Sequence, residues 1–182
     1  MERFKSIEDP SGNPELEKLY GEIVGSGFGV GGKPIRWFTA QAIRPDLLAA
    51  TWALVRGVLA EGQLPATLKQ LMTLAISAQN GCRYCAETHR GALEALGIDR
   101  AIAERAAKDP TLAEFPPAYR AAVAFGCKAA REPGALTDDD YAALRAAGYS
   151  DGEVLEIVMV AAYTNFTNTW ADAGKIPLDA AG

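Results

Sequence analysis

Several residue types that define whole classes of protein are scarce in this sequence. Among 182 residues there are three cysteines and one histidine. A disulfide framework needs paired cysteines and belongs mainly to secreted proteins, so three cysteines favour thiol chemistry in a reducing compartment. A structural zinc site needs four ligands, and the nitrogen and sulfur donors at hand are Cys82, Cys85, His89 and the distant Cys127. We therefore expect no bound metal and keep a zinc-binding module as an alternative.

Basic clusters and long apolar runs are also absent. Lysine and arginine together number 18 against 23 for aspartate and glutamate, which gives a net charge of −5. Nucleic-acid binding depends on neutralising phosphates, so this balance argues against it. The opening residues MERFKSIEDPSG lack the apolar core of a secretory signal, and no run approaches the length of a membrane span. We expect a cytoplasmic protein that binds neither nucleic acid nor membrane.

Apolar residues recur at helical spacing through most of the chain. Its 182 residues, 49% of them hydrophobic, suffice for one domain with its own core. We predict a single all-α domain over residues 1–182, in which residues 1–14 form an irregular lead-in and residues 65–97 form a helix hairpin. Residues 25–34 contain a GxGxxG pattern, but no strand precedes it, so we interpret them as a flexible loop.

Two of the cysteines and the only histidine lie in one stretch, LKQLMTLAISAQNGCRYCAETHRGALEALG. Apolar residues have helical spacing on both sides of Asn80-Gly81. Glycine tolerates the left-handed backbone at which many helices end, so this dipeptide is expected to end the first helix of the hairpin. The second helix then opens with a Cys-x-x-Cys-x-x-x-His motif, whose members are Cys82, Cys85 and His89.

The three motif residues are expected to project from one helix face, because residues three or four apart are neighbours on a helix. Unpaired N–H groups at a helix start lower the pKa of a thiol, and an imidazole can accept its proton. The helix dipole alone would activate Cys82, whereas a histidine four residues further on favours Cys85. A second thiol nearby can convert an oxidised sulfur into a disulfide, so we interpret the pair as a redox dithiol.

Residues outside the motif are candidates to support it. In an antiparallel hairpin Gln70 lies at about the height of His89, so it can orient the imidazole through a hydrogen bond. Ser77 shares a helix face with Gln70, and Tyr84, between the cysteines, is a candidate wall of a pocket. Glu156 stands in an apolar segment; either the helix dipole favours a carboxylate there, or Glu156 supplies the site with a carboxylate.

The phrase LKQLMTLAISAQNGCRYCAETH resembles the signature of the alkylhydroperoxidase D-like and carboxymuconolactone decarboxylase-like superfamily, in its peroxidase-related branch. The resemblance implies an all-α alkylhydroperoxidase D-like helical bundle built around the hairpin. It also implies an antioxidant thiol peroxidase that reduces organic hydroperoxides, with Cys85 as the attacking thiol, Cys82 as the resolving thiol and His89 as the proton acceptor. Where the family usually has glutamate, twelve residues before the first cysteine, this sequence has Gln70.

The resemblance further implies the partners of such an enzyme. A dithiol reductant of the lipoyl or thioredoxin-like type would restore the thiols, no bound cofactor is required, and the chain would form a homo-oligomer, a dimer, trimer or hexamer. Two other functions stay open. A carboxymuconolactone decarboxylase-like enzyme would not depend on the two cysteines. A redox-sensing module, or a scaffold with inert thiols, would keep them without turnover.

Overall fold

Helices make up most of the described residues and strands very few, which confirms the predicted all-α class. The structure, a computed structural model, describes residues 2–109 and 114–179, so residue 1 of the predicted lead-in and residues 180–182 of the tail lie outside the described residues. The helices are α1 (Pro14–Gly25), α2 (Arg36–Thr39), α3 (Pro45–Val55), the π-helix η1 (Arg56–Ala60), α4 (Ala66–Gln79), α5 (Arg83–Ala95), α6 (Arg100–Lys108), α7 (Pro117–Arg131), the 3-10 turn η2 (Pro133–Ala135), α8 (Asp138–Ala146) and α9 (Asp151–Gly174).

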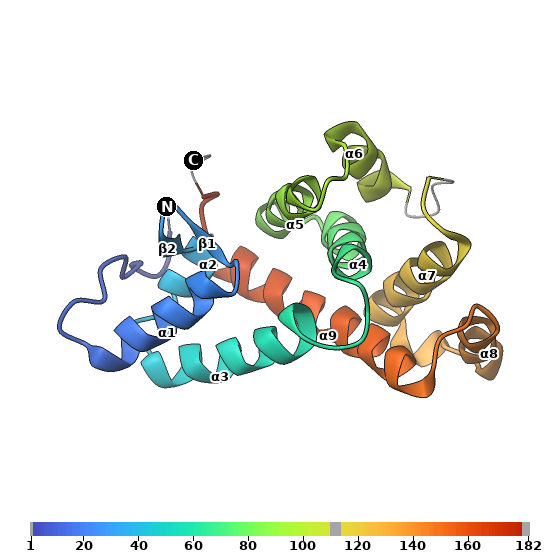
Figure 1. Cartoon of the computed structure of the whole chain (residues 1–182), viewed down its shortest axis with the longest axis horizontal. Coiled ribbons are helices and arrows are strands. Elements are labelled where there is room, and N and C mark those ends of the chain that lie inside the picture. The colour runs from blue at the N-terminus through green and yellow to red at the C-terminus, as the bar shows by residue number, and fades with distance from the viewer. Residues whose placement is uncertain (1, 110–113, 180–182) are drawn as a thin grey trace.

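Helix α9, with 24 residues, runs through the middle of the molecule (Figure 1). Helices α4 and α7 pack against α9, and α5 packs on α4. Helices α1, α2 and α3 gather at one end of the molecule, and α7 and α8 lie toward the other (Figure 1). The first and last described segments meet near the end of α9, where the amide of Arg3 donates to the carbonyl of Gly174 at 3.0 Å.

Helix α4 forms the buried half of the predicted hairpin, because α5, α6, α7 and α9 all pack against it. At Gly126 on α7, any side chain would collide with Met72, so glycine allows α7 to approach α4 closely. Burying a leucine-sized side chain contributes about 2 kcal/mol, which makes α4 a firm support for residues near the motif. The fully buried apolar residues of α4 are Leu68, Leu71, Met72, Leu74, Ala75 and Ile76.

The segment predicted as a flexible loop, residues 25–34, contains a short antiparallel hairpin. Strand β1 (Gly29–Val30) pairs with β2 (Lys33–Pro34) in the register Gly29 with Pro34 and Val30 with Lys33. The two residues between the strands, Gly31 and Gly32, have φ of 58° and 78°. Two successive positive φ angles make the tight turn that joins antiparallel strands, and glycine adopts them without strain. Gly31 and Gly32 therefore form the turn of this hairpin.

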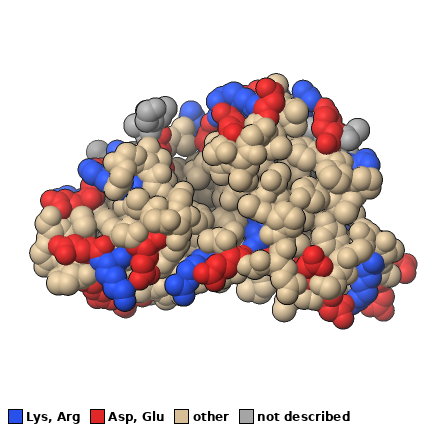
Figure 2. Space-filling view, in the orientation of Figure 1, with Lys and Arg blue, Asp and Glu red and all other residues tan. Residues whose placement is uncertain are grey.

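The surface is charged mainly around the edge of the face shown in Figure 2, where a hollow separates the N-terminal helices from the part that contains α5 and α6. Helix α9 carries exposed apolar side chains: Leu155 is 62% exposed, Met159 41% and Phe166 44%. Spacings of four and seven residues place them along one side of the helix, and we call them the α9 stripe. Among the described helices, none combines the length and apolar content that crossing a membrane requires.

Candidate active site

The turn between α4 and α5 brings both motif cysteines to the start of a helix. Helix α4 ends at its C-cap Asn80, and Gly81 follows with φ of 73°, in the left-handed region that the sequence predicted for this turn. Cys82 is the N-cap of α5, and its amide donates to the carbonyl of Ser77 at 3.0 Å. Cys85 follows about one helical turn later and faces the same side.

The two thiols form a buried, hydrogen-bonded pair. Cys82 is 1% exposed and Cys85 3%, and both are free thiols. The hydrogen bond from Cys82 is the largest cause of a lowered pKa at Cys85. The same bond, followed by burial, raises the pKa of Cys82. Cys85 is therefore the more acidic thiol of the pair, which supports the role of attacking thiol that the resemblance implied.

Helix α9 also stabilises the Cys85 thiolate. The side chain of Asn168 hydrogen-bonds to the sulfur and lowers the pKa of Cys85 further, as Thr167 does to a smaller extent. The hydroxyl of Thr167 also donates to the carbonyl of Thr164 at 2.9 Å, so its proton is shared between two acceptors. Buried hydrogen bonds to a thiolate favour its charged form.

Asn168 is held in place by an amide network around the α4–α5 turn. Its Nδ2 donates to Oγ of Ser77 at 3.0 Å, and its Oδ1 accepts from Nδ2 of Asn80 at 2.8 Å. The same Asn80 amide also lies 2.9 Å from Oδ1 of Asn165. Sequence spacing placed Ser77 near the site but gave Asn168 no such role. The sequence does show amides at helical spacing in an apolar segment, but spacing alone does not say which residue they contact.

His89 and Gln70 are brought together, as the antiparallel hairpin predicted. Nδ1 of His89 lies 2.5 Å from Oε1 of Gln70. An amide oxygen has no proton to donate, so Nδ1 carries the proton and Nε2 is left as an acceptor. Burial lowers the pKa of His89 to about 4, so the ring is neutral at pH 7.

A small apolar cavity of about 40 Å³ opens beside Cys85 and His89, and we call it the Cys85 cavity. Both residues line it, so a reacting atom placed there would lie near the thiolate and the imidazole together. Rings cover most of its wall; Trp37 and Phe38, for example, meet edge to face at 5.0 Å between centroids. The aromatic residues that line it are Phe28, Trp37, Phe38, Tyr84 and Tyr163.

Tyr84, predicted as a wall residue, lines the Cys85 cavity and ties three segments together. Its hydroxyl accepts from the amide of Trp37 at 3.2 Å and donates to Oδ2 of Asp179 at 2.6 Å. Oδ1 of Asp179 in turn accepts from the amide of Arg36 at 2.8 Å. The tail after α9 packs against the rest of the molecule: Ile176 is 7% exposed and Asp179 is bound on both oxygens.

The carboxylate of Glu156 is bound by the start of α4 and by the loop that precedes it. It forms an ion pair with Lys69, which is 1% exposed, and accepts from the amides of Gln63 and Leu64 at 2.8 Å and 3.3 Å. These contacts close the loop before α4. They give no support to the interpretation of Glu156 as a carboxylate that acts on His89.

The third cysteine, Cys127, lies on α7 and hydrogen-bonds to the side chain of Gln79, while burial raises its pKa to about 11. A thiol with a raised pKa is a poor nucleophile at neutral pH. In residues 2–109 and 114–179, no three side chains of His, Cys, Asp or Glu come together in a way that could hold a metal ion.

The sequence matches a known family over part of its length. Residues 45–127, which include the motif, match the carboxymuconolactone decarboxylase family. No protein with curated annotation matches the sequence.

Several solved structures share the fold of the whole chain. An uncharacterized peroxidase-related protein from Ralstonia eutropha JMP134, with an alkylhydroperoxidase AhpD core, is 23% identical with a TM-score of 0.87, over 98% of this chain and 93% of that one. A peroxidase-related protein from Silicibacter sp. TM1040 is 22% identical with a TM-score of 0.86, over 98% and 92%.

A third solved structure is a cysteine-to-alanine variant of the debrominase Bmp8 in complex with 2,3,4-tribromopyrrole. It is 23% identical with a TM-score of 0.80, over 96% of this chain and 91% of that one. Relatives of this fold therefore include more than one chemistry. The family match covers residues 45–127, and the solved structures show that the chain shares their fold; both agree with the resemblance carried by the cysteine motif.

Proposed function

We propose that the chain is a thiol-dependent peroxidase that reduces small organic hydroperoxides. The observation that carries the proposal is the hydrogen-bonded thiol pair, in which Cys85 is the more acidic member and shares a cavity with His89. A thiolate is the nucleophile of peroxide chemistry, and a second thiol beside it allows a disulfide to form. The match to peroxidase-related folds supports an antioxidant role.

The proposed reaction has two steps. In the first, the Cys85 thiolate attacks the peroxide; the O–O bond breaks, an S–O bond forms, and the departing oxygen takes a proton and leaves as an alcohol. In the second, the sulfenic acid on Cys85 condenses with the Cys82 thiol, an S–S bond forms and water leaves. The peroxide gains two electrons and the thiol pair loses two. An external thiol reductant returns them by exchange.

His89 would carry the proton between these groups. Its free Nε2 can accept the proton of the Cys85 thiol and return it to the departing oxygen. Gln70 fixes the ring through Nδ1, but as a neutral amide it does not stabilise an imidazolium. The neutral ring of His89 would therefore accept the proton, and no carboxylate at Gln70 would stabilise the cation that results.

The test is a count of free thiols and an intact mass before and after one equivalent of cumene hydroperoxide, with peptide mapping. Rapid loss of two thiols, mapped to a Cys82–Cys85 disulfide with Cys127 still free, is the expected result. Cys127→Ser should behave in the same way, and Cys85→Ser should not react. Survival of both thiols in the native chain would rule the peroxidase out.

Reductive dehalogenation of a small haloaromatic is a second candidate, favoured by the aromatic wall of the Cys85 cavity. The thiolate would take the bromine from carbon as an S–Br bond while the carbon gains a proton, and Cys82 would then displace bromide as the disulfide forms. Electrons balance as before, since the dithiol supplies two. Bromide release and thiol loss with 2,3,4-tribromopyrrole, without oxygen, would support this reaction; absence of bromide would exclude it for that substrate.

A further inference from the structure

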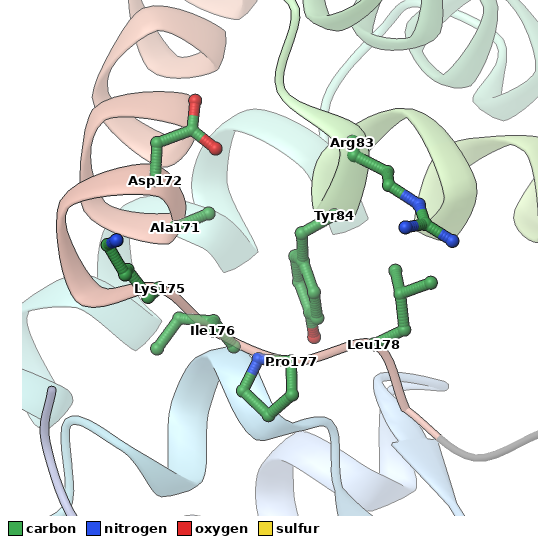
Figure 3. A pocket seen from close by; sticks show the side chains of 8 residues that line it. All are labelled: Arg83, Tyr84, Ala171, Asp172, Lys175, Ile176, Pro177 and Leu178. Atoms are coloured by element: carbon green, nitrogen blue, oxygen red, sulfur yellow. The ribbon is translucent and has the colours of Figure 1, made fainter. Parts of the chain in front are cut away.

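A second cavity, of about 300 Å³, lies beside the motif and is larger than the Cys85 cavity. Tyr84 lines both, so its side chain stands between them. The walls of the larger cavity come from the first turn of α5, the end of α9 and the tail that follows α9 (Figure 3). We call it the α5–α9 groove. Its volume is at the lower end of the range for small-molecule sites.

The α5–α9 groove is charged, in contrast to the Cys85 cavity. Arg83 and Lys175 contribute two cations, and Asp172 contributes a carboxylate. Figure 3 shows Asp172 projecting from α9 and Arg83 from α5 on opposite sides of Tyr84. Within the part of the chain that the structure describes, none of these three charged side chains makes an ion pair or a hydrogen bond. Their charges are therefore available to a ligand.

The α5–α9 groove is close to the thiol pair, although neither cysteine lines it: Arg83 and Tyr84, which do, lie between Cys82 and Cys85 in the sequence. Arg83 directly follows Cys82 in the chain. The negative charge of Asp172 raises the pKa of both Cys82 and Cys85, so its carboxylate is within electrostatic reach of each sulfur. In a Cys82–Cys85 disulfide, the thiol with the lower pKa leaves faster, so an incoming thiolate attacks Cys82 and releases Cys85.

Building on the proposed peroxidase function, we propose that the α5–α9 groove binds the reductant, and that the reductant is a small peptide-like thiol with carboxylate and ammonium groups. Arg83 and Lys175 match carboxylates, and Asp172 matches an ammonium group. A neutral lipoyl chain would leave all three charges unmatched. The reductant and the peroxide therefore use separate cavities on either side of Tyr84.

Reduction of the Cys82–Cys85 disulfide takes two successive thiol exchanges. The bound thiolate attacks the sulfur of Cys82, the protein disulfide breaks, and Cys85 leaves as a thiolate that Asn168 stabilises. A second small thiol then attacks the ligand sulfur of the mixed disulfide, and Cys82 leaves and takes a proton. Two small thiols become one disulfide, and the protein regains both thiols. Because Cys82 is 1% exposed and does not line the groove, the side chains between the two have to move during attack.

The test uses the full chain with its Cys82–Cys85 disulfide formed by diamide, so that it does not depend on reaction with a peroxide. Release of protein thiols is followed with glutathione and with glutathione diethyl ester, which has the same thiol but no free carboxylate. At equal thiolate concentration we expect glutathione to react roughly tenfold faster. Arg83→Ala should bring this ratio toward one, whereas Arg131→Ala, an exposed arginine on α7, should leave it unchanged.

Equal rates for glutathione and its ester in the native chain would overturn the proposal, as would a ratio that survives loss of both Arg83 and Lys175. Faster reduction by dihydrolipoamide, independent of Arg83, would also overturn it and assign the reductant to the lipoyl type. The two proposals can fail independently. If the chain shows the expected glutathione ratio but its thiols survive hydroperoxide, the groove binds the reductant as proposed and the peroxidase proposal is wrong.

Discussion

Gln70 occupies the position at which the superfamily resemblance implies a glutamate, and it contacts Nδ1 of His89 at 2.5 Å. A carboxylate there would stabilise an imidazolium, whereas an amide only selects the tautomer. Burial then decides the charge of the ring and lowers its pKa to about 4. At the residue scale, the site therefore combines an acidic thiol with a neutral imidazole.

The titration of His89 should be visible in the stability of the protein, because it is the only histidine in the chain. Above pH 6.5 the ring is neutral in both the folded and unfolded states. Below it, the unfolded chain gains a proton that the folded chain, with a pKa of about 4, does not bind. The free energy of unfolding should therefore fall by about 2 kcal/mol from this group between pH 8 and pH 5. Urea titrations at four pH values measure it, and His89→Gln should lack that part of the slope. Identical slopes would contradict a buried neutral ring.

Asn168 should control the acidity of the attacking thiol. Asn168→Ala removes a hydrogen bond to the Cys85 thiolate, so the pKa of Cys85 should rise. The rate of alkylation by iodoacetamide, followed from pH 5 to 10 in a Cys127→Ser background, gives that pKa. Asn165→Ala is the matched control, because it changes the same amide network through Asn80 but removes no hydrogen bond to the thiol; its own Nδ2 donates to the carbonyl of Ala130 at 2.7 Å. An equal shift in both variants would indicate a general loss of packing.

At the element scale, much of the hairpin could be predicted from sequence because its determinants are local. Gly81 has the positive φ that the Asn80-Gly81 stop requires, and the contact between Gln70 and His89 follows from counting residues back and forward from the turn. The capping box of Ser150 with Glu153 at the start of α9 is likewise a local motif, recognisable from residues three apart in the sequence. Each of these features depends on residues close in sequence or symmetric about one turn.

Contacts between distant elements could not be predicted in this way. Asn168 reaches Cys85 because α9 packs against α4 and α5, and spacing along one helix does not say which neighbour its polar side will meet. The ion pair between Glu156 and Lys69 could not be predicted for the same reason, since the two residues lie far apart in the sequence. The tail was difficult for another reason: Asp179 is ordered by the hydroxyl of Tyr84 and the amide of Arg36, which no local pattern indicates.

The tie between Tyr84 and the tail should limit access to the thiols. Tyr84→Phe removes the hydroxyl that links Asp179 and the amide of Trp37. Hydrogen exchange should then rise in peptides that cover residues 175–179, and alkylation of Cys82 should accelerate by roughly tenfold, because a hydrogen bond to a charged group is lost. Glu15→Gln, an exposed change on α1, should alter neither rate. Faster exchange without faster alkylation would show that the tail does not guard the dithiol.

At the scale of the whole molecule, the α9 stripe is the surface we expect a homo-oligomer to use. A single chain leaves Leu155 62% exposed and Met159 41% exposed on its central helix, and such patches commonly mark contacts between proteins. A Leu155→Lys and Met159→Lys double variant should therefore lower the mass in solution measured by light scattering. Leu96→Lys, on a leucine that is 46% exposed at the end of α5, is the control. An unchanged mass in the double variant would place any subunit contact elsewhere.

The position of Tyr84 between two cavities has a kinetic consequence. If oxidant and reductant enter from different sides, neither blocks the entrance of the other, and the thiol pair alone passes electrons from one half-reaction to the next. Double-reciprocal plots at several fixed reductant concentrations should then give parallel lines, and excess reductant should not compete with the peroxide. Inhibition by high glutathione that more peroxide relieves would mean that both molecules pass through a single shared opening.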